Sequence, residues 1–247
     1  GQNVNIPDAN FKAYLVGEPD INTNGDTEIQ VSEAAVYNPS SAYNEYFDCS
    51  YMGISDLTGI EAFTSLKELY CHGNNLTSLD LSQNTALREL KCDNNNLDTL
   101  DLSYNIALRA VICYNNSLTS LDLSYNNIAL KEVLCYNNSL TSLDLSYNIA
   151  LTYLDCSANN ITNLDISNNT DLYQLYCYYN LLTSLDLSNN TALTYLGCGD
   201  NQITCLDVSD NTALTNLDCS NNLLEQLNTT NGNWINNLWV NALSNNL

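Results

Sequence analysis

Ten cysteines are the most reactive side chains of this 247-residue sequence, and eight of them recur at a nearly fixed spacing. The eight are Cys71, Cys92, Cys113, Cys135, Cys156, Cys177, Cys198 and Cys219. None of these spacings is the Cys-x-x-Cys of zinc or redox sites, and a single histidine cannot supply further zinc ligands. We therefore predict one inward-facing column of buried free thiols. Cys205 falls outside this column, and we expect it to face solvent as the reactive thiol.

A second column consists of carboxylates at the same period. Its members are Asp80, Asp101, Asp122, Asp144, Asp165, Asp186 and Asp207. Carboxylates about 4.8 Å apart repel each other by roughly 0.9 kcal/mol in a water-like dielectric, which exposure and salt make tolerable. Two interpretations stay open: a solvated edge that keeps the protein soluble and blocks sheet pairing, and a stripe that binds cations.

Oxygen-bearing side chains alternate along residues 22–33, and this spacing suits a divalent cation. The candidate ligands are Asn22, Asn24, Asp26, Glu28 (through its carbonyl) and Glu33. They fall at positions 1, 3, 5, 7 and 12 of a loop that resembles the EF-hand, and the resemblance implies a structural calcium ion. Thr27 stands where the EF-hand has glycine. The alternative is therefore an Asn/Asp/Gly turn that caps a helix over residues 32–37.

The cysteine and aspartate columns belong to one sequence repeat. Each unit opens with a leucine, at Leu66, Leu87, Leu108, Leu130, Leu151, Leu172, Leu193 and Leu214. Each unit also contains two strand-like triplets, Leu-x-Cys and Leu-Asp-Leu, whose alternation points the flanking residues inward and the middle residue outward. A unit of 21 residues is too short for two strands and a helix. We therefore predict a repeat solenoid with a short parallel strand on each of two sides of every coil.

At this point the residues resemble a known family. The motif Leu-x-x-Leu-x-Cys-x-x-Asn-x-Leu is similar to the leucine-rich repeat, and the nested Leu-x-x-Leu-Asp-Leu-x-x-Asn resembles its 21-residue IRREKO class. Residues 54–66 are similar to the first repeat of internalin-like bacterial surface proteins. The resemblance covers about residues 44–240. It implies a structural asparagine ladder starting at Asn74, and a secreted or cell-surface location in bacteria.

The ends of the chain depart from the repeat. We expect residues 1–43 to form a small helical cap with the EF-hand-like loop, and residues 44–247 to form the solenoid. In the solenoid, a degenerate first coil precedes eight regular coils at 66–234 and an incomplete last coil. A constant spacing puts Val240 in the cysteine position of that last coil and Leu243 where asparagine belongs. Because no C-terminal cap is evident, we expect a fragment of a longer protein.

One face of the repeat changes from coil to coil, whereas the second triplets hardly change. The variable positions are the outward ones of the first triplet, and tyrosines collect there in the middle coils. The candidate ligand-binding residues are Tyr114, Tyr136, Tyr153, Asp155, Gln174, Tyr176, Tyr178 and Tyr195, beside an expected bare notch at Gly197 and Gly199. Tyrosine suits protein hot spots and sugar faces alike. The alternative is that tyrosine merely fits a strand surface.

Charge and composition restrict the function. The formal net charge is −22, and every Lys and Arg precedes Glu132, which argues against nucleic acid and anionic membranes as partners. No apolar run reaches the roughly 18 residues of a membrane span. The single His72 and the uniform Ser and Asp columns offer no unique catalytic set. We expect a non-catalytic recognition module that binds a protein or a glycan. The alternative is a rigid acidic spacer; ligand identity and oligomeric state stay open.

Overall fold

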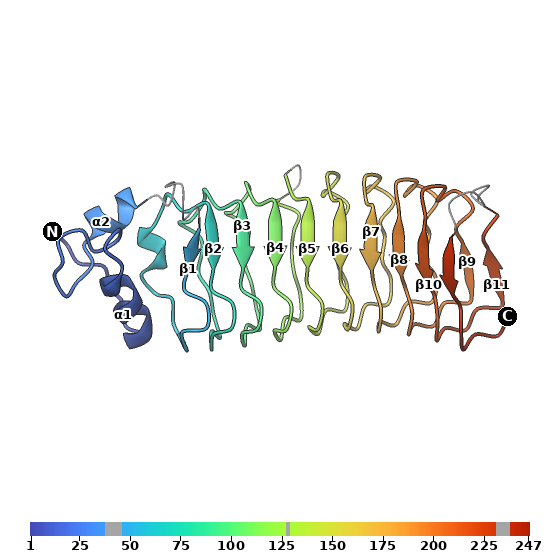
Figure 1. Cartoon of the computed structure of the whole chain (residues 1–247), viewed down its shortest axis with the longest axis horizontal. Helices are drawn as coiled ribbons and strands as arrows, with labels where there is room; N and C mark the ends of the chain where they lie inside the picture. Colours follow the sequence, from blue (N-terminus) through green and yellow to red (C-terminus); the bar gives the residue numbers. More distant parts are fainter. Residues whose placement is uncertain (38–45, 127–128, 231–237) are drawn as a thin grey trace.

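The protein is a rod of stacked coils with a helical cap at its N-terminal end (Figure 1). The computed structural model describes residues 1–37, 46–126, 129–230 and 238–247. The predicted solenoid and cap are confirmed. The expected boundary between residues 43 and 44 lies outside the described residues.

The cap contains two short helices. Helix α1 (Ala9–Gly17) begins at Asp8, whose Oδ1 accepts hydrogen bonds from the amides of Asn10 and Phe11, both at 2.9 Å. Helix α2 (Val31–Val36) begins with a capping box between residues 30 and 33. Oδ2 of Asp8 also accepts the amide of Ser55 at 2.9 Å, so the same carboxylate caps α1 and ties the cap to the coils.

The cap closes the apolar interior of the first coil. Phe11 is fully buried, and its ring centroid lies 6.3 Å from that of Phe47 in an edge-to-face contact. Phe47 also packs edge-to-face against Phe63, at 5.4 Å, just after the short 3-10 helix η1 (Ile60–Ala62). These aromatic rings replace the leucines that a preceding coil would have supplied.

One parallel sheet runs along the whole rod. Its strands, in spatial order, are β1 (Phe47–Asp48), β2 (Glu68–Tyr70), β3 (Glu89–Lys91), β4 (Ala110–Ile112), β5 (Glu132–Leu134), β6 (Tyr153–Asp155), β7 (Gln174–Tyr176), β8 (Tyr195–Gly197), β10 (Asn216–Asp218) and β12 (Trp239–Asn241). Neighbouring strands pair in register, so that Leu154 pairs with Leu175 and Leu175 with Leu196. Equivalent residues of successive coils therefore stack in straight rows.

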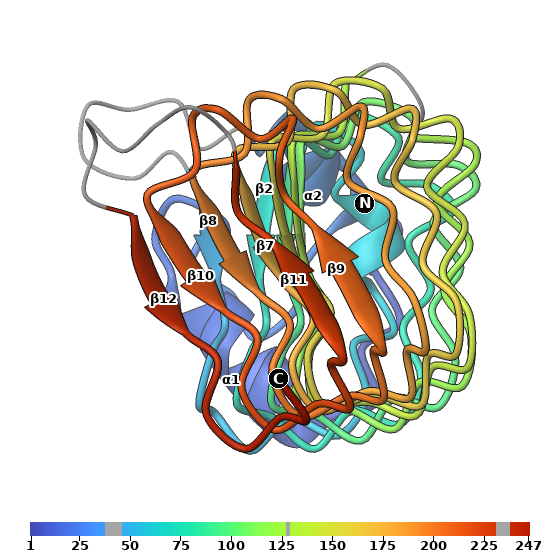
Figure 2. The ribbon, with the colours of Figure 1, turned by 90° about the vertical axis from the view of Figure 1, so that its right-hand side faces the viewer.

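Within the described residues, the second predicted strand forms in two coils. There β9 (Cys205–Asp207) and β11 (Gln226–Asn228) pair in a separate two-stranded parallel sheet, which Figure 2 shows beside the row of β8, β10 and β12. In the other described coils the Leu-Asp-Leu triplet is not a strand, which corrects the expectation of two strands per coil. On the first side, backbone hydrogen bonds pair the strands of successive coils. On the other side of most coils, buried leucines and side-chain amides such as that of Asn169 make the contacts between coils instead.

Two asparagine columns tie the coils together. In the first, which was predicted, Nδ2 of Asn159 donates to the carbonyls of Cys135 and Cys156, and its Oδ1 accepts the amide of Leu140. In the second, Nδ2 of Asn169 donates to two carbonyls of the preceding coil, while its buried Oδ1 has no partner. The first column therefore satisfies a donor that the chain turn would otherwise leave buried and unpaired.

Each turn after a first-side strand contains a residue with left-handed backbone geometry. Its φ lies between 51° and 58° at Asn94, Asn115, Asn137, Ala158, Tyr179, Asp200, Asn221 and Ser244. Asparagine tolerates this region better than most residues, which accounts for its frequency at the position. Alanine and tyrosine also occupy it here, so the fold imposes the turn even on less suited side chains.

The last coil is longer than the sequence period predicts. Strand β12 pairs Val240 with Leu217, a separation of 23 residues. Ala242 therefore takes the cysteine position, and Asn245 continues the ladder through bonds from its Nδ2 to the carbonyls of Cys219 and Ala242. The assignment of Val240 to the cysteine position was wrong, because burial and the asparagine contacts set the register rather than a constant count.

Candidate recognition surface

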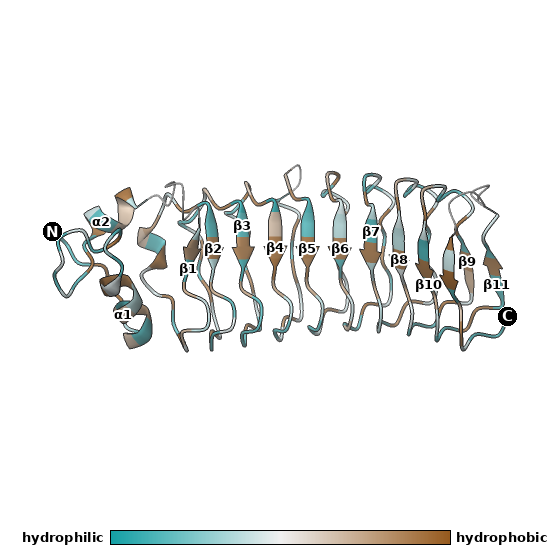
Figure 3. Cartoon of the chain, in the orientation of Figure 1, coloured by the Kyte–Doolittle hydropathy of each residue, from teal (hydrophilic) through white to brown (hydrophobic). Residues whose placement is uncertain are grey.

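The first-side strands present three rows of outward side chains along the rod. Strands β2, β3 and β5 each carry hydrophilic and hydrophobic residues (Figure 3), since a buried residue lies between two outward ones. All eight candidate residues lie on strands β6 to β8 or in the turns that follow β4, β5 and β7. Each is half-buried. Neighbouring side chains therefore cover part of each candidate residue, and the apolar exposure of the face is smaller than the sequence suggests.

Four tyrosines form one contact cluster, which we call the tyrosine cluster: Tyr153, Tyr176, Tyr178 and Tyr195. Tyr176 is central, with ring centroids at 5.6 Å from Tyr153, 6.4 Å from Tyr178 and 4.7 Å from Tyr195. The hydroxyls of Tyr178 and Tyr195 lie 3.1 Å apart in a hydrogen bond. Strand register brings these residues together, because Tyr153, Gln174 and Tyr195 stand in one row and Tyr176 stands in the next.

The expected bare notch is filled by one of these rings. A Cβ atom added at Gly197 would lie 2.2 Å from the ring of Tyr178, and one added at Gly199 would lie 3.2 Å from it. Tyr178 therefore lies over the two glycines, and a larger side chain at Gly197 would displace its ring. The notch was a wrong inference, since the sequence did not show that a neighbouring coil covers it.

A second aromatic contact lies on the N-terminal side of this cluster. The rings of Tyr114 and Tyr136 stack at 4.2 Å with an interplanar angle of 7°. Asp155 lies between the two groups, in the row that pairs Leu134 on one side with Tyr176 on the other. Burial raises the pKa of Asp155, although the amide of Ser157 donates to its Oδ1 at 3.0 Å. The partly desolvated carboxylate of Asp155 thus lies between the Tyr114–Tyr136 pair and the tyrosine cluster.

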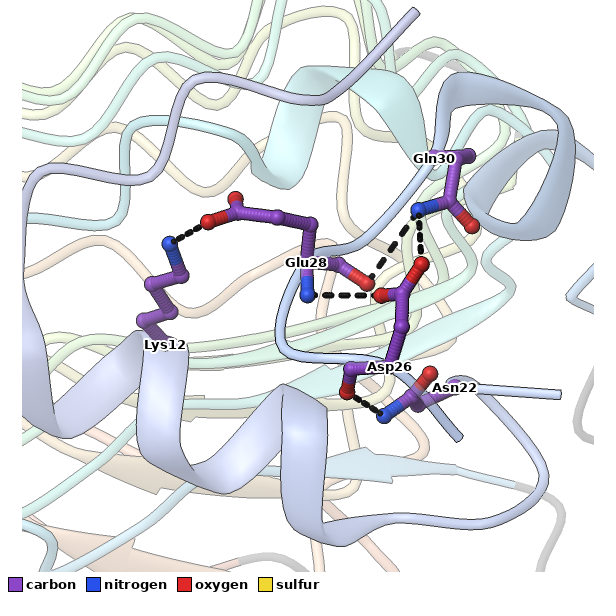
Figure 4. Close-up of polar contacts among 5 residues, drawn as sticks. All are labelled: Lys12, Asn22, Asp26, Glu28 and Gln30. Carbon is purple, nitrogen blue, oxygen red and sulfur yellow. Dashed lines mark hydrogen bonds and ion pairs between the residues drawn. The ribbon is translucent and has the colours of Figure 1, made fainter. Parts of the chain in front are cut away.

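The EF-hand-like loop is closed by hydrogen bonds within the chain (Figure 4). Nε2 of Gln30 donates to Oδ2 of Asp26 at 3.1 Å and to the carbonyl of Glu28 at 3.5 Å, and so stands between two predicted ligands. Nδ2 of Asn22 donates to the carbonyl of Asp26 at 2.8 Å. The side-chain amides of Gln30 and Asn22 thus donate to oxygens of the predicted ligands Asp26 and Glu28.

The other candidate ligands are also engaged. The Glu33 carboxylate accepts from the hydroxyl of Thr23 and from the amides of Asn24 and Gln30, and these bonds outweigh burial and lower its pKa. The Glu28 carboxylate pairs with Lys12 at 2.7 Å. As they stand, these residues do not present a free oxygen cage, and calcium binding stays a prediction that rests on the spacing.

The cysteine prediction is confirmed. Nine of the ten cysteines are buried free thiols, and Cys205 is exposed. Burial raises the pKa of the column, for example of Cys156 and Cys177, so these thiols stay neutral and act as small apolar core residues. The column has no role in a surface site, and Cys205 is the accessible thiol.

The aspartate column has a structural partner. In each of the seven regular positions the aspartate Oδ1 accepts the amide of the serine two residues later, at 2.8–3.0 Å. These serine bonds lower the pKa of Asp101, Asp144 and Asp186. The serine bonds therefore favour the charged form of these three carboxylates while the column shapes the turn. Cation binding by it stays a hypothesis.

His72 is held in a local contact. Its Nδ1 lies 2.9 Å from the hydroxyl of Ser50, and its ring packs edge-to-face on Tyr51 at 5.1 Å. Among the described residues, no three His, Cys, Asp or Glu side chains are grouped to hold a metal ion. None of the described helices has the length and apolar character needed to cross a membrane. The expectation that the protein is not an enzyme stays a prediction.

Sequence reasoning missed a further group of tyrosines on the second side. Tyr104, Tyr125 and Tyr147 are all exposed, and each follows the Asp-Leu-Ser of its coil. The signal was present, because the same position holds Gln83, Asn168 and Asn189 in other coils.

Comparison with known proteins agrees with this architecture. A family model described as "Leucine Rich repeat" matches residues 114–131 and 136–148. The solved functional domain of InlJ from Listeria monocytogenes, described as including a cysteine ladder, is 38% identical with a TM-score of 0.71, over 92% of this chain and 53% of that one. The internalin InlF of the same species is 21% identical with a TM-score of 0.74, over 97% and 76% of the two chains.

A sequence relative matches more locally. Internalin J of Listeria monocytogenes is 58% identical over 38 residues, which is 15% of this chain and 4% of that protein. The chain thus spans about half of the solved InlJ domain and a small part of the full-length relative. Function, substrates and partners of the whole protein are therefore matters for proposal.

The stacked parallel strands, the leucine interior and the asparagine ladder define a leucine-rich repeat protein. Within that class the chain is internalin-like, as its repeat and its identity to InlJ show.

Proposed function

We propose that the chain is the recognition module of a secreted or cell-surface bacterial protein, and that its tyrosine-rich first-strand face binds a protein or a glycan. The observation that carries this proposal is the tyrosine cluster, with Asp155 beside it, on a rigid sheet. The likeness to Listeria internalins supports the bacterial surface setting.

The cluster is suited to binding because its rings are held before a partner arrives. Tyr176 contacts three other rings, and Tyr178 lies on the buried glycines. Side chains that are already ordered lose little conformational entropy on association, which favours affinity. The ring edges supply apolar contact, and the hydroxyls supply hydrogen bonds, a combination that suits both sugar rings and protein side chains.

Asp155 supplies directional recognition. Its carboxylate is partly buried between the aromatic groups, where a hydrogen bond from a ligand N–H or O–H is stronger than in water. A ligand that donates to Asp155 while it packs on Tyr176 would also recover the desolvation cost of the carboxylate.

The proposal can be tested with paired variants. Intact protein should be screened on a glycan array and against surface-protein extracts, with calcium and with chelator. Replacing Tyr153, Tyr176 and Tyr195 by Ala should abolish any specific hit without unfolding the rod. The control is Tyr179→Ala, because Tyr179 is exposed, lies outside the cluster, and occupies the position that Ala158 holds in the preceding coil. Hits that survive the triple variant would move the site elsewhere.

The alternative function is a rigid acidic spacer in a larger surface protein. The regular second side, with an aspartate in seven successive coils, favours this alternative, since like charges keep such a rod soluble. A blank array and the absence of any protein partner under both calcium conditions would support the spacer over the recognition module.

A further inference from the structure

A stripe of exposed apolar residues lies beside the aspartate column, on the opposite side of the coils from the proposed site. Tyr104, Tyr125 and Tyr147 stand at one position of three consecutive coils and are 57%, 53% and 57% exposed. Ile106 and Ile149, two residues further on, are 63% and 54% exposed. We call these five residues the second aromatic stripe. Large apolar side chains in one contiguous surface group commonly mark an interaction site.

The stripe lines hollows at the junctions between coils. One hollow, of about 310 Å³, is lined by Asp80, Asp101 and Tyr104 together with residues 79–82. The next, of about 220 Å³, is lined by Asp101, Asp122 and Tyr125 with residues 99–103. Each hollow therefore combines a carboxylate from each of two neighbouring coils with one tyrosine ring. The same combination thus occurs at two successive coil junctions, and Asp101 lines both hollows.

The hollows carry uncompensated negative charge. Hydrogen bonds from Ser103 lower the pKa of Asp101, which lines both hollows, so this carboxylate is ionised at neutral pH. The ion pairs within the described ranges join Lys12 to Glu28 and Lys91 to Glu89, and neither involves this column. The sequence has no Lys or Arg after Lys131. The charge must therefore be balanced by solvent ions or by a partner.

Elsewhere in the chain, a tyrosine ring and a carboxylate together hold a basic side chain. On the first side, Nζ of Lys91 lies 4.1 Å from the ring centroid of Tyr70 and 3.0 Å from Oε1 of Glu89. An ammonium group thus rests on a tyrosine ring while it pairs with a carboxylate. Cation–π attraction and ion pairing reinforce each other in this arrangement.

We propose that the second aromatic stripe and its hollows are a docking surface for a basic protein segment, whose Lys or Arg side chains enter successive hollows. Charge complementarity identifies the occupant. A second copy of this chain carries the same net charge of −22 and would be repelled. The hollows do not supply the three grouped ligands of a metal site among the described residues. Ile106 and Ile149 would contact the apolar parts of the same segment.

The test is a fluorescence anisotropy titration of intact protein with a labelled octapeptide that alternates Arg and Ser, at low and at physiological salt. Replacing Tyr104, Tyr125 and Tyr147 by Asn should weaken binding about fivefold. This change installs the residue that Asn168 and Asn189 provide at the same position, so it should leave the fold intact.

A matched pair of charge variants separates docking from general attraction between opposite charges. The Asp101, Asp122 and Asp144→Asn triple removes three charges beside the tyrosines. The Asp165, Asp186 and Asp207→Asn triple removes three charges where the tyrosine position holds Asn168, Asn189 and Asp210. We expect the first triple to weaken binding at least threefold more than the second. Equal losses from both triples, with no effect of the tyrosine variant, would overturn the proposal. Self-association in ultracentrifugation that the tyrosine variant abolishes would also overturn it, in favour of a second copy.

Discussion

The two asparagine columns predict that equal truncations in one coil will have unequal costs. Asn159→Ala removes the acceptor of the Leu140 amide, a bond of 2.9 Å, and leaves that buried N–H without a partner. It also removes the two Nδ2 hydrogens, which are shared among the carbonyls of Cys135, Cys156 and Ser157. Each of these carbonyls keeps another donor, from Asn138, Asn180 and the amide of Asn137 respectively. One orphaned donor costs about 2 kcal/mol and two lost bonds about 0.5 kcal/mol each, so we expect a total of about 3 kcal/mol.

Asn169→Ala is the matched control, because the side chain is also buried and loses the same atoms. Its Nδ2 donates to the carbonyls of Leu145 and Asn148, and both carbonyls keep a backbone partner. Its Oδ1 is already buried without a partner, so the truncation removes an unfavourable group as well as two bonds. The expected cost is about 1 kcal/mol or less.

Urea unfolding of the two variants measures this difference. A gap of about 2 kcal/mol corresponds to roughly 4–8 °C in melting temperature for a chain of this size. Hydrogen exchange adds a local readout, since the Leu140 amide should lose protection in Asn159→Ala and keep it in Asn169→Ala. Equal costs, or a larger cost for Asn169→Ala, would refute the claim that accepting a turn amide is the main contribution of the ladder.

Three further predictions follow from the site geometry. A thiol reagent should label only Cys205 in the native protein and all ten cysteines in urea; fast labelling of a second cysteine would show that the column is accessible. Burial raises the pKa of Asp155 in the folded state. Between the ordinary pKa of an aspartate and this raised pKa, the folded state therefore binds more protons at Asp155 than the unfolded state does. The free energy of unfolding consequently falls as the pH rises through that interval. Asp155→Asn should remove this fall and be more stable than the unaltered protein at pH 7, measured by urea unfolding from pH 4 to 8; parallel pH curves for the two proteins would contradict it. If calcium displaces Nε2 of Gln30 from Asp26, millimolar calcium should give measurable heat in a calorimetric titration. The Glu33→Gln variant should abolish this heat. No heat with the unaltered protein would remove the calcium proposal.

Much of the fold could be predicted because the same residue pattern occurs in many successive units. The cysteine column from Cys71 to Cys219 predicted a buried position in each coil. Asn74 and its equivalents predicted that asparagine side chains bond the backbone amides at the turns. The prediction of the register failed in the last coil, which departs from the repeat and has no second copy in the sequence. The last coil was placed by counting from Leu217, and two additional residues moved Val240 out of the cysteine position.

The candidate site was predictable as a set of residues but not as a set of contacts. The variable row predicted that Tyr153, Tyr176 and Tyr195 face outward together, and register confirms that they do. It did not predict that Tyr178 covers Gly197, because the direction of a side chain across neighbouring coils depends on packing. For the same reason the loop sequence did not predict that Nε2 of Gln30 donates to Asp26 and Glu28.

The sequence by itself determined the period, the inward and outward positions and the charge, because these follow from residue type and spacing along one chain. Only the tertiary structure decided which triplets pair as strands, which rings stack and which polar atoms are satisfied. Those outcomes depend on distances between residues about 21 positions apart, and stacking of whole coils sets such distances.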